Sequence, residues 1–349
     1  MSKVKVAIIG AGNIAQNAHL PVYMQRDDVE IVAIADLNLE RAQEAAKKFG
    51  IPNAYSSVEE LLEKEGDNVE CVDVCVWNRS HAPVAIAAAK AGKAVLCEKP
   101  LALNLEHALQ MEKEIGECGT LFMCGLVNRY RPDVSLVREM YDQGKFGDVY
   151  FATASYVRRR GTPIGWFTDT TKSGGGPVID IGVHAIDRTW YMMGCPKPVR
   201  LSANISNRIG DFKTKGVNRW LALDSDVTAF DTEDSAAGVI HFENGATMLF
   251  ECSWALNAAP REYSEICGSL AGAKLDAESL TVYGEDCGYL SDQTPTFINQ
   301  NPFEIEIGHF LDCYRTGKQP VSTMAHAVTV QRMLEGIYQS AKLGREVEL

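Results

Sequence analysis

Residues 4–15 read VKVAIIGAGNIA, an apolar run that passes directly into a glycine-rich turn. A run such as Val4–Ile9 is typical of a strand that is buried on both faces of a parallel sheet. Gly10 suits a tight turn, Gly12 lets a phosphate approach the backbone amides, and Ala15 permits close packing of the next helix on the strand. Because this G-x-G-x-x-A pattern lies between a strand and a helical stretch, it predicts a dinucleotide-binding βαβ unit.

The chain beyond this turn continues to alternate strands with helices. Apolar strand patterns occupy Ile31–Ala35, Val72–Val76, Ala94–Cys97 and Leu121–Gly125. Helical patterns lie between them at Leu39–Phe49, Val58–Lys64, Pro83–Ala91 and Leu105–Cys118. Such alternation predicts a doubly wound parallel sheet. We therefore expect an α/β Rossmann domain over residues 1–126.

The second strand ends at Asp36, where a carboxylate can accept both ribose hydroxyls of NAD. The same carboxylate repels the 2′-phosphate of NADP. Leu37 and Asn38 carry no compensating charge, and Arg41 is the only nearby cation. The sequence therefore favours NAD over NADP.

Two further segments follow the carboxyl ends of strands, where a doubly wound sheet binds its ligand. After the third strand, Asn78 and His81 are candidate cofactor contacts, although Asn78 or Ser80 could instead cap the Pro83 helix. After the fourth strand comes Lys99, whose alternative role is a surface pair with Glu98. The full set of expected cofactor contacts is Gly10, Gly12, Asn13, Ile14, Asp36, Leu37, Arg41, Trp77, Asn78, His81, Glu98, Lys99 and Asn128.

Residues 174–187 read GGGPVIDIGVHAID and contain an acid–imidazole pair. Asp180 and His184 are four residues apart, a spacing that stacks both side chains on one face of a helix. The carboxylate can then orient the imidazole, which leaves the other ring nitrogen able to accept a proton. The glycine run before the pair allows the backbone to approach a ligand closely.

Residues 127–349 are expected to form a second, α+β domain for substrate binding and oligomerisation. Its strand patterns lie at Asp148–Arg158, Val199–Ile209, Ser235–Phe242, Ala246–Ala255, Glu262–Cys267 and Ala273–Ala277. Asn244–Gly245 between two of them is a strong hairpin signal. These features predict a large open, mainly antiparallel sheet, with a C-terminal helix over Ala325–Leu343 that packs back on the body.

Two stretches of the second domain are candidates for shaping a substrate pocket. Arg158–Pro163 leads to the aromatic pair Trp166–Phe167, an arrangement that suits a sugar, since rings stack on its C–H face and arginine binds its hydroxyls. Asp211–Asp231 could form a lid. The expected substrate contacts are Lys99, Arg129, Tyr156, Arg158, Trp166, Asp180 and His184.

Composition excludes several other classes of protein. The 349 residues carry a net charge of −12, whereas a nucleic-acid scaffold is usually basic. No apolar run approaches the length of a membrane span, and MSKVKVAIIG lacks the features of a signal peptide, so we expect a cytoplasmic protein with no membrane partner. The ten cysteines form no CxxC pair and lie among apolar residues, which predicts reduced thiols and no metal site.

Together these motifs resemble the Gfo/Idh/MocA oxidoreductase family. GAGNIA, Glu98-Lys99-Pro100 and GGGPVIDIGVH match its three hallmark motifs in the right order. The resemblance implies an NAD(P)-dependent oxidoreductase acting on CH–OH groups, with Lys99, Asp180 and His184 as the catalytic set. It also implies a homodimer or homotetramer assembled through the C-terminal sheet. Trp77 departs from the family, because many members have proline there.

Five stretches carry a closer resemblance within the family: Arg158–Phe167, Ser173–His184, Glu233–Ser235, Ser253–Asn257 and Tyr338–Leu349. In these the chain most resembles bacterial dehydrogenases that oxidise the C3 hydroxyl of D-glucosides to a keto sugar. This reading predicts His184 as general base and Lys99 as the group that polarises the substrate oxygen. Three alternatives remain open. They are a dehydrogenase of inositol at C2 or of another sugar or nucleotide sugar, a redox-assisted glycoside-cleaving enzyme with tightly bound NAD, and a non-enzymatic NAD-binding sensor.

Overall fold

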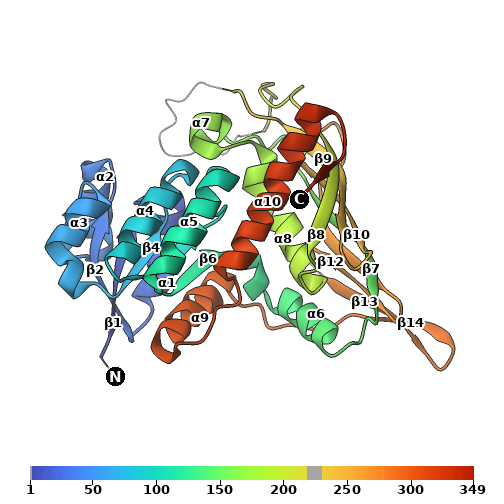
Figure 1. Ribbon diagram of the computed structural model, residues 1–349, viewed down its shortest axis with the longest axis horizontal. Helices are drawn as coiled ribbons and strands as arrows, with labels where there is room; N and C mark the ends of the chain where they lie inside the picture. The colour runs from blue at the N-terminus through green and yellow to red at the C-terminus, as the bar shows by residue number, and fades with distance from the viewer. Residues whose placement is uncertain (1, 218–229, 278) are drawn as a thin grey trace. The chain divides into compact units, whose positions relative to one another are not determined.

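The structure is a computed structural model that describes residues 2–217, 230–277 and 279–349. It divides into two compact units. The first contains Met1–Val127 and Asn301–Val328, and the second contains Asn128–Gln300 and Thr329–Leu349. Figure 1 labels the helices and strands by the names used below.

The first unit contains the predicted parallel sheet, with the strand order β3-β2-β1-β4-β5-β6. The strands are β1 (Val4–Ile9), β2 (Val29–Ala35), β3 (Asn53–Tyr55), β4 (Cys71–Val74), β5 (Ala94–Glu98) and β6 (Phe122–Gly125). Every neighbouring pair is parallel. The strand order reverses between β1 and β4, the topological point at which doubly wound sheets bind their ligands. The Rossmann prediction is confirmed, although the short edge strand β3 was not expected.

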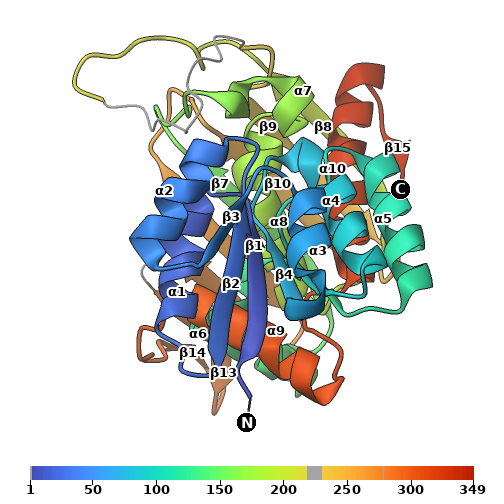
Figure 2. The ribbon, with the colours of Figure 1, turned by 90° about the vertical axis from the view of Figure 1, so that its left-hand side faces the viewer.

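Helices cover both faces of this sheet. They are the π-turn η1 (Ala15–His19), α1 (Leu20–Met24), α2 (Leu39–Phe49), α3 (Val58–Glu65), the 3₁₀ turn η2 (Gly66–Asn68), α4 (Asn78–Lys90) and α5 (Leu105–Cys118). Figure 2 shows α1 and α2 on one side of the sheet and α3, α4 and α5 on the other.

The ends of α2 follow from local chemistry. The Asn38 side chain accepts the Arg41 N–H at the start (3.1 Å), and Gly50 ends the helix with a φ of 68°. The predicted start of α4 at Pro83 was wrong by five residues. The helix starts at Asn78 and contains Pro83 in its interior. Burial of Asn78, His81 and Ala82 favours this earlier start over the usual preference of proline for a first turn.

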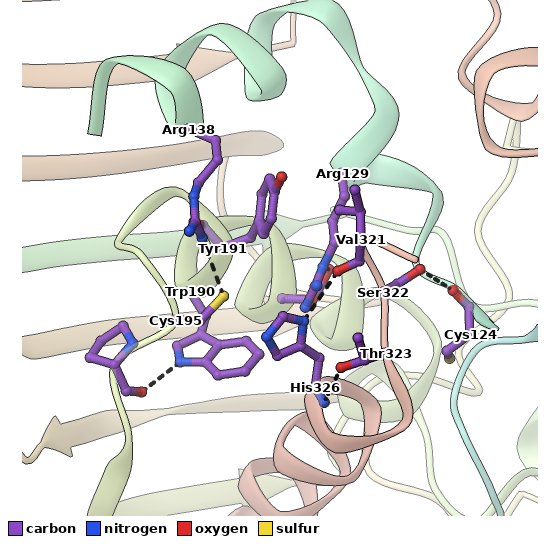
Figure 3. Close-up of polar contacts among 12 residues, drawn as sticks. Cys124, Arg129, Arg138, Trp190, Tyr191, Cys195, Val321, Ser322, Thr323 and His326 are labelled. Atoms are coloured by element: carbon purple, nitrogen blue, oxygen red, sulfur yellow. Dashed lines mark hydrogen bonds and ion pairs between the residues drawn. The ribbon is translucent and has the colours of Figure 1, made fainter. Parts of the chain in front are cut away.

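A segment distant in sequence completes the first unit. Helix α9 (Pro302–Thr316) packs against η1 and α1, and Arg315 forms an ion pair with Asp28 (2.7 Å). Ser322 donates its hydroxyl to the Cys124 carbonyl at the end of β6 (2.7 Å; Figure 3). The expected continuous second domain over 127–349 therefore differs from the structure at residues 301–328, because contacts with elements near the N-terminus leave no local signal in the sequence.

The second unit is built on a nine-stranded sheet with the order β14-β13-β12-β11-β7-β10-β9-β8-β15. The strands are β7 (Val149–Val157), β8 (Pro198–Ser206), β9 (Ser235–Phe242), β10 (Thr247–Ser253), β11 (Arg261–Gly268), β12 (Gly272–Asp276), β13 (Leu280–Asp286), β14 (Tyr289–Gln293) and β15 (Val347–Glu348). Only β7 and β10 pair in parallel, so the prediction of a mainly antiparallel sheet is confirmed. The Asn244–Gly245 hairpin joins β9 to β10, as predicted.

Helices pack on this sheet and close the core of the second unit. They are η3 (Val127–Tyr130), α6 (Pro132–Asp142), η4 (Trp166–Thr168), α7 (Thr170–Ser173), the π-turn η5 (Val178–Gly182), α8 (Val183–Met192) and α10 (Met324–Leu343). Helix α8 contacts β7, β10 and β11. The part of α10 in this unit adds Met333, Leu334 and Ile337 to the core, as expected for a C-terminal helix that packs back.

Three further predictions can be compared with the described residues. All ten cysteines are free and six are buried, which supports reduced thiols. Among these residues, no helix has the length and apolar character needed to cross a membrane. The predicted lid at Asp211–Asp231 falls largely on residues 218–229, which lie outside the described residues.

Candidate active site

The glycine turn after β1 has the geometry that a dinucleotide requires. Gly10 has a φ of 103°, and a Cβ there would lie 2.4 Å from the Cys75 carbonyl oxygen, so only glycine fits. A Cβ on Gly12 would meet no atom within 4 Å, so the space beside it is open. Ala15 is fully buried where the helix starts. The turn therefore fits a pyrophosphate held by backbone amides at a helix N-terminus.

The carboxylate of Asp36 is already fixed by its own surroundings. It accepts the backbone N–H groups of Ala11 and Asn38, both at 2.8 Å. It also pairs with Arg41 through Nη2 to Oδ1 (2.7 Å) and Nε to Oδ2 (3.1 Å). Because the carboxylate and the cation stand together, Arg41 offsets part of the negative charge that the sequence argument assigned to Asp36.

Other expected cofactor contacts differ in exposure. Ile14 and Leu37 are exposed, Asn13 and Trp77 are half-buried, and Asn78 is buried at the start of α4. Capping of α4 by a side chain is not observed, since Trp77 occupies the N-cap without such a bond.

His81 lies buried in α4 beside two backbone carbonyls. Its Nδ1 lies 2.7 Å from the Pro100 oxygen and its Nε2 lies 3.1 Å from the Val76 oxygen. Burial lowers the pKa of His81 below its usual value, although both carbonyls oppose this shift. The ring therefore links α4 to the carbonyl of Pro100, the residue after Lys99.

Lys99 follows β5 directly, at the carboxyl edge of the parallel sheet. Its side chain is half-buried, and a cis peptide bond joins it to Pro100. The backbone N–H of Lys99 donates to Glu98 Oε2 (2.9 Å), and Glu98 Oε1 lies 3.0 Å from His19 Nε2. The Glu98 carboxylate thus contacts protein groups through both of its oxygens.

Asp180 and His184 lie in the second unit, on two different kinds of helix. Asp180 belongs to the π-turn η5 and His184 to the first turn of α8, and both side chains are half-buried. The expected geometry of one regular α-helix is therefore wrong here, since a π-turn carries more residues per turn. The buried Trp254 donates its indole N–H to Asp180 Oδ2 (2.8 Å).

A buried carboxylate holds the glycine run that precedes Asp180. Glu233 accepts the N–H groups of Gly176 (3.0 Å) and Val178 (3.1 Å), and Tyr338 donates its hydroxyl to Glu233 Oε1 (3.0 Å). Burial raises the pKa of Glu233, although these hydrogen bonds oppose the shift. A Cβ on Gly175 would lie 1.9 Å from the Tyr338 hydroxyl, which explains the glycine.

The roles of Trp254, Glu233 and Tyr338 were not predicted from the sequence. The stretches Glu233–Ser235 and Ser253–Asn257 stand out only through their family resemblance, which gives no role to an individual side chain. The position of a tryptophan or a glutamate in the sequence does not show which group its side chain will hydrogen-bond in the fold.

Tyr156, Arg158 and Trp166 are candidate substrate residues of the second unit. Tyr156 and Arg158 lie together near the end of β7, where Arg158 Nη2 donates to the Tyr156 hydroxyl (3.3 Å). Burial lowers the pKa of Arg158, but Asp180 and Tyr156 outweigh it, so the net shift is upward. Trp166 stacks on Phe167 with ring centroids 4.0 Å apart.

Arg129 lies elsewhere, in a buried ion pair with Asp187. The closest contact joins Nη2 to Oδ1 (2.6 Å), and Arg129 is 1% exposed. Figure 3 shows the Tyr191 ring between Arg129 and Arg138, whose guanidinium carbons lie 4.9 and 5.0 Å from the ring centroid. This environment gives Arg129 a packing role in the second unit. Asn128, beside it in η3, is half-buried.

Comparison with known proteins adds independent information on this chain. Residues 4–126 match the family described as "Oxidoreductase family, NAD-binding Rossmann fold" (GFO_IDH_MocA), and residues 134–274 match its "GFO/IDH/MocA C-terminal domain". A D-glucoside 3-dehydrogenase from Escherichia coli K12 is 32% identical, and the match covers 100% of this chain and 98% of the relative.

Two other similar proteins show the range of relatives. A D-xylose 1-dehydrogenase (NADP(+)) from Haloferax volcanii is 27% identical, with 98% of each chain covered. A levoglucosan dehydrogenase structure with NADH and L-sorbose has a TM-score of 0.87 at 24% identity and covers 100% of this chain and 99% of its own. At that identity, the structural likeness speaks for the fold alone.

Proposed function

We propose that this chain, which belongs to the Gfo/Idh/MocA oxidoreductase family, oxidises the C3 hydroxyl of D-glucose or a D-glucoside to a keto sugar. The observation that carries the proposal is the full-length similarity to a D-glucoside 3-dehydrogenase at 32% identity. The stacked pair Trp166–Phe167 and the hydrogen-bonded pair Tyr156–Arg158 support a sugar as substrate, because together they offer aromatic faces and a hydroxyl-binding cation.

In this mechanism, His184 takes the proton of the sugar hydroxyl as general base. Asp180, held by the Trp254 N–H, stabilises the positive charge that develops on the imidazole. Lys99 stabilises the substrate oxygen while it becomes a carbonyl. NAD, when bound, supplies the acceptor for the hydride that leaves the same carbon. The products are the keto sugar, NADH and one proton.

NAD is the proposed cofactor, with NADP less suited. The buried Asp36 carboxylate supports ribose binding, and its two backbone hydrogen bonds hold it in place. Its ion pair with Arg41 is the one feature that favours a 2′-phosphate. The kcat/KM ratio for the two cofactors tests this point, and a ratio in favour of NADP contradicts it.

A homodimer or homotetramer through the nine-stranded sheet is part of the proposal. Its support is the sheet face opposite α8, where Leu249 is 43% and Tyr283 is 38% exposed. Light scattering on the purified protein tests the assembly, and Leu249→Glu should shift it toward monomers. A wild-type protein that is monomeric at micromolar concentration contradicts it.

The decisive experiment follows NADH absorbance with NAD and a substrate panel of glucose, methyl and aryl glucosides, myo-inositol and UDP-sugars. An increase in NADH absorbance with glucosides, together with a 3-keto product identified by NMR, supports the proposal. Preference for inositol or UDP-sugars overturns it in favour of those substrates. If no substrate gives NADH and the purified protein still holds NAD, the result points instead to redox-assisted glycoside cleavage.

The role of Lys99 is tested with the substrate that this panel identifies. Lys99→Ala should lower turnover by about 10²–10⁴-fold, the usual range for a positioned proton-transfer group. Full activity of that variant contradicts the role.

A further inference from the structure

The first unit contains a cluster of buried titratable side chains, none of which has a role in the proposed mechanism. It brings together His19 from η1, Asp73 from β4, Glu98 from β5 and Glu306 from α9. His19, Asp73 and Glu306 are 0% exposed and Glu98 is 6% exposed. Charged groups are rarely buried unless they are paired, so the arrangement needs an explanation.

His19 joins two carboxylates through its two ring nitrogens. Nδ1 lies 2.7 Å from Asp73 Oδ2, and Nε2 lies 3.0 Å from Glu98 Oε1. Burial lowers the pKa of His19, but Asp73 and Cys75 outweigh it, so the pKa lies well above its usual value. The protonated ring donates both N–H groups, because an ionised carboxylate only accepts. His19 therefore bridges β4 and β5 as an imidazolium.

The bridge continues from Glu98 to the backbone of Lys99. Glu98 Oε2 accepts the Lys99 N–H at 2.9 Å, while Oε1 is occupied by His19. Gly125, the partner of Glu98 on β6, allows the backbones of the two strands to lie close together here. A Cβ at Gly125 would lie 3.2 Å from Glu98 Cα and 3.5 Å from its Cδ.

Glu306 closes the cluster without adding a charge. Both of its carboxylate oxygens are buried and have no hydrogen-bond partner among the residues that the structure describes. Burial raises the pKa of Glu306 well above its usual value, and the negative Glu98 adds to this effect. From the same helix, the Phe303 ring lies 5.4 Å from the ring of His19. The returning segment 301–328 thus covers the imidazolium with an aromatic ring and a neutral acid.

A metal ion is not needed to explain the cluster. His19, Asp73 and Cys75 form the one set of three close candidate ligands among the described residues. Both nitrogens of His19 already face carboxylate oxygens, so neither is available to a metal without breaking a short hydrogen bond.

We propose that His19 is a positioning residue for Lys99: through Nε2 it holds Glu98 in the orientation that fixes the Lys99 backbone. The catalytic consequence rests on the proposed function of Lys99. The structural part, fixation of the Lys99 amide, does not. A lysine displaced by about 1 Å loses much of its effect on the reaction, which gives His19 its influence on turnover.

Two substitutions at His19 separate this role from simple packing. His19→Gln places an amide N–H near the position of Nε2 and keeps the bond to Glu98. His19→Asn places one near Nδ1 and keeps only the bond to Asp73. His309→Asn is the matched control, because His309 is a partly buried histidine of the same unit that accepts the Val321 N–H (3.0 Å).

Three readouts are measured on the full-length protein: hydrogen exchange of the Lys99 amide, NADH affinity by fluorescence, and kcat and KM with the sugar identified above. His19→Asn should accelerate Lys99 exchange and lower kcat, each by about 10–100-fold, with NADH affinity little changed. His19→Gln should retain most of the protection of the Lys99 amide and most of kcat. His309→Asn should leave the exchange rate and kcat within about twofold of wild type.

Equal effects of His19→Asn and His19→Gln on Lys99 exchange overturn the proposal, as does a loss of kcat with unchanged exchange. If His19→Asn does not fold, Glu98→Gln replaces the charged acceptor of the Lys99 N–H by a neutral amide of the same size, and unchanged Lys99 exchange in that variant also overturns it. If the wild type forms no NADH with any sugar, only the proposed function is refuted. The positioning role of His19 is still tested, because hydrogen exchange of the Lys99 amide needs no substrate.

Discussion

Glu98 in the first unit and Glu233 in the second each hold backbone next to a predicted catalytic residue, but in opposite electrostatic surroundings. Glu98 fixes the Lys99 N–H and faces the imidazole of His19. Glu233 fixes the Gly176 and Val178 N–H groups and faces the Tyr338 hydroxyl. One carboxylate has a cationic partner, whereas the other has only neutral donors.

This difference decides the pKa of each group. Burial raises the pKa of Glu98, but the hydrogen bond and charge of His19 outweigh it, and the net shift is downward. Burial also raises the pKa of Glu233, and there the neutral donors do not outweigh it. The partner His19 thus shifts the pKa of Glu98 downward against burial, whereas the hydrogen bonds to Glu233 do not reverse the upward shift that burial causes.

Removing each carboxylate should give the largest contrast. Glu98→Ala leaves the His19 imidazolium with one partner and should cost about 3–5 kcal/mol of unfolding free energy. Glu233→Ala leaves neutral donors unpaired and should cost less, about 1–3 kcal/mol. Urea unfolding near neutral pH measures both. Equal losses would contradict the view that His19 is charged.

Substituting glutamine for each carboxylate should give opposite dependences on pH. The pKa of Glu98 is lowered from 4.5, so its charge stabilises the wild type above that value and the benefit is lost as pH falls below it. The pKa of Glu233 is raised from 4.5, so its stabilisation is complete below that value and is lost as pH rises through the folded pKa.

The free energy of unfolding of wild type relative to Glu98→Gln should therefore grow as pH rises toward 4.5. Relative to Glu233→Gln it should shrink as pH rises above 4.5. Unfolding midpoints over a series of acidic to neutral buffers give both curves. Slopes of the same sign would show that the two carboxylates do not differ in the way described.

The hydrogen bond to Asp180 should have a moderate effect on catalysis. Trp254→Phe keeps an aromatic ring but removes the N–H donor, and kcat should fall about tenfold, the equivalent of about 1.4 kcal/mol. Trp190→Phe is the matched control, since this buried indole donates to the Pro196 carbonyl (2.7 Å) instead. Similar kcat losses in the two variants would assign the effect to packing.

The smallest expected effect concerns the third donor to Glu233. Tyr338→Phe removes one neutral hydrogen bond while Gly176 and Val178 still donate, so it should cost about 1 kcal/mol. The same substitution in a Glu233→Ala background should cost less, because the partner is absent there. A double-mutant cycle by urea unfolding measures the difference. Additive losses would mean that the two side chains do not interact.

Much of the fold was predictable because its signals are local. The G-x-G-x-x-A turn, the apolar strands and the cap of α2 by Asn38 depend on neighbours within a few residues. The missed strands β13 and β14 show the limit of that approach. In β14, Tyr289 and Leu290 are 77% and 93% exposed, so β14 does not show the half-buried alternation that reveals a strand in sequence.

The candidate site was predictable only in part for the same reason. Lys99, Asp180 and His184 stand in recognisable motifs, and the structure places Lys99 after β5 as expected. The π-turn at Asp180 was missed because its four-residue spacing to His184 fits an α-helix equally well in sequence. Arg129 seemed suited to a substrate, but its partner Asp187 lies 58 residues further along the chain.

The sequence by itself determined the alternation of strands and helices in the Rossmann domain and the turn at Gly10, since hydrophobic period and turn chemistry depend on neighbouring residues. The resemblance of three motifs indicated the oxidoreductase family. Only the tertiary structure decided that His19, Asp73, Glu98 and Glu306 form one buried cluster. These residues come from four elements: His19 joins Asp73 and Glu98 across β4 and β5, and Glu306 is added because α9 returns to pack on η1 and α1. Burial and the partners that packing brings together then shift their pKa values, and both depend on the packed fold rather than on any single segment.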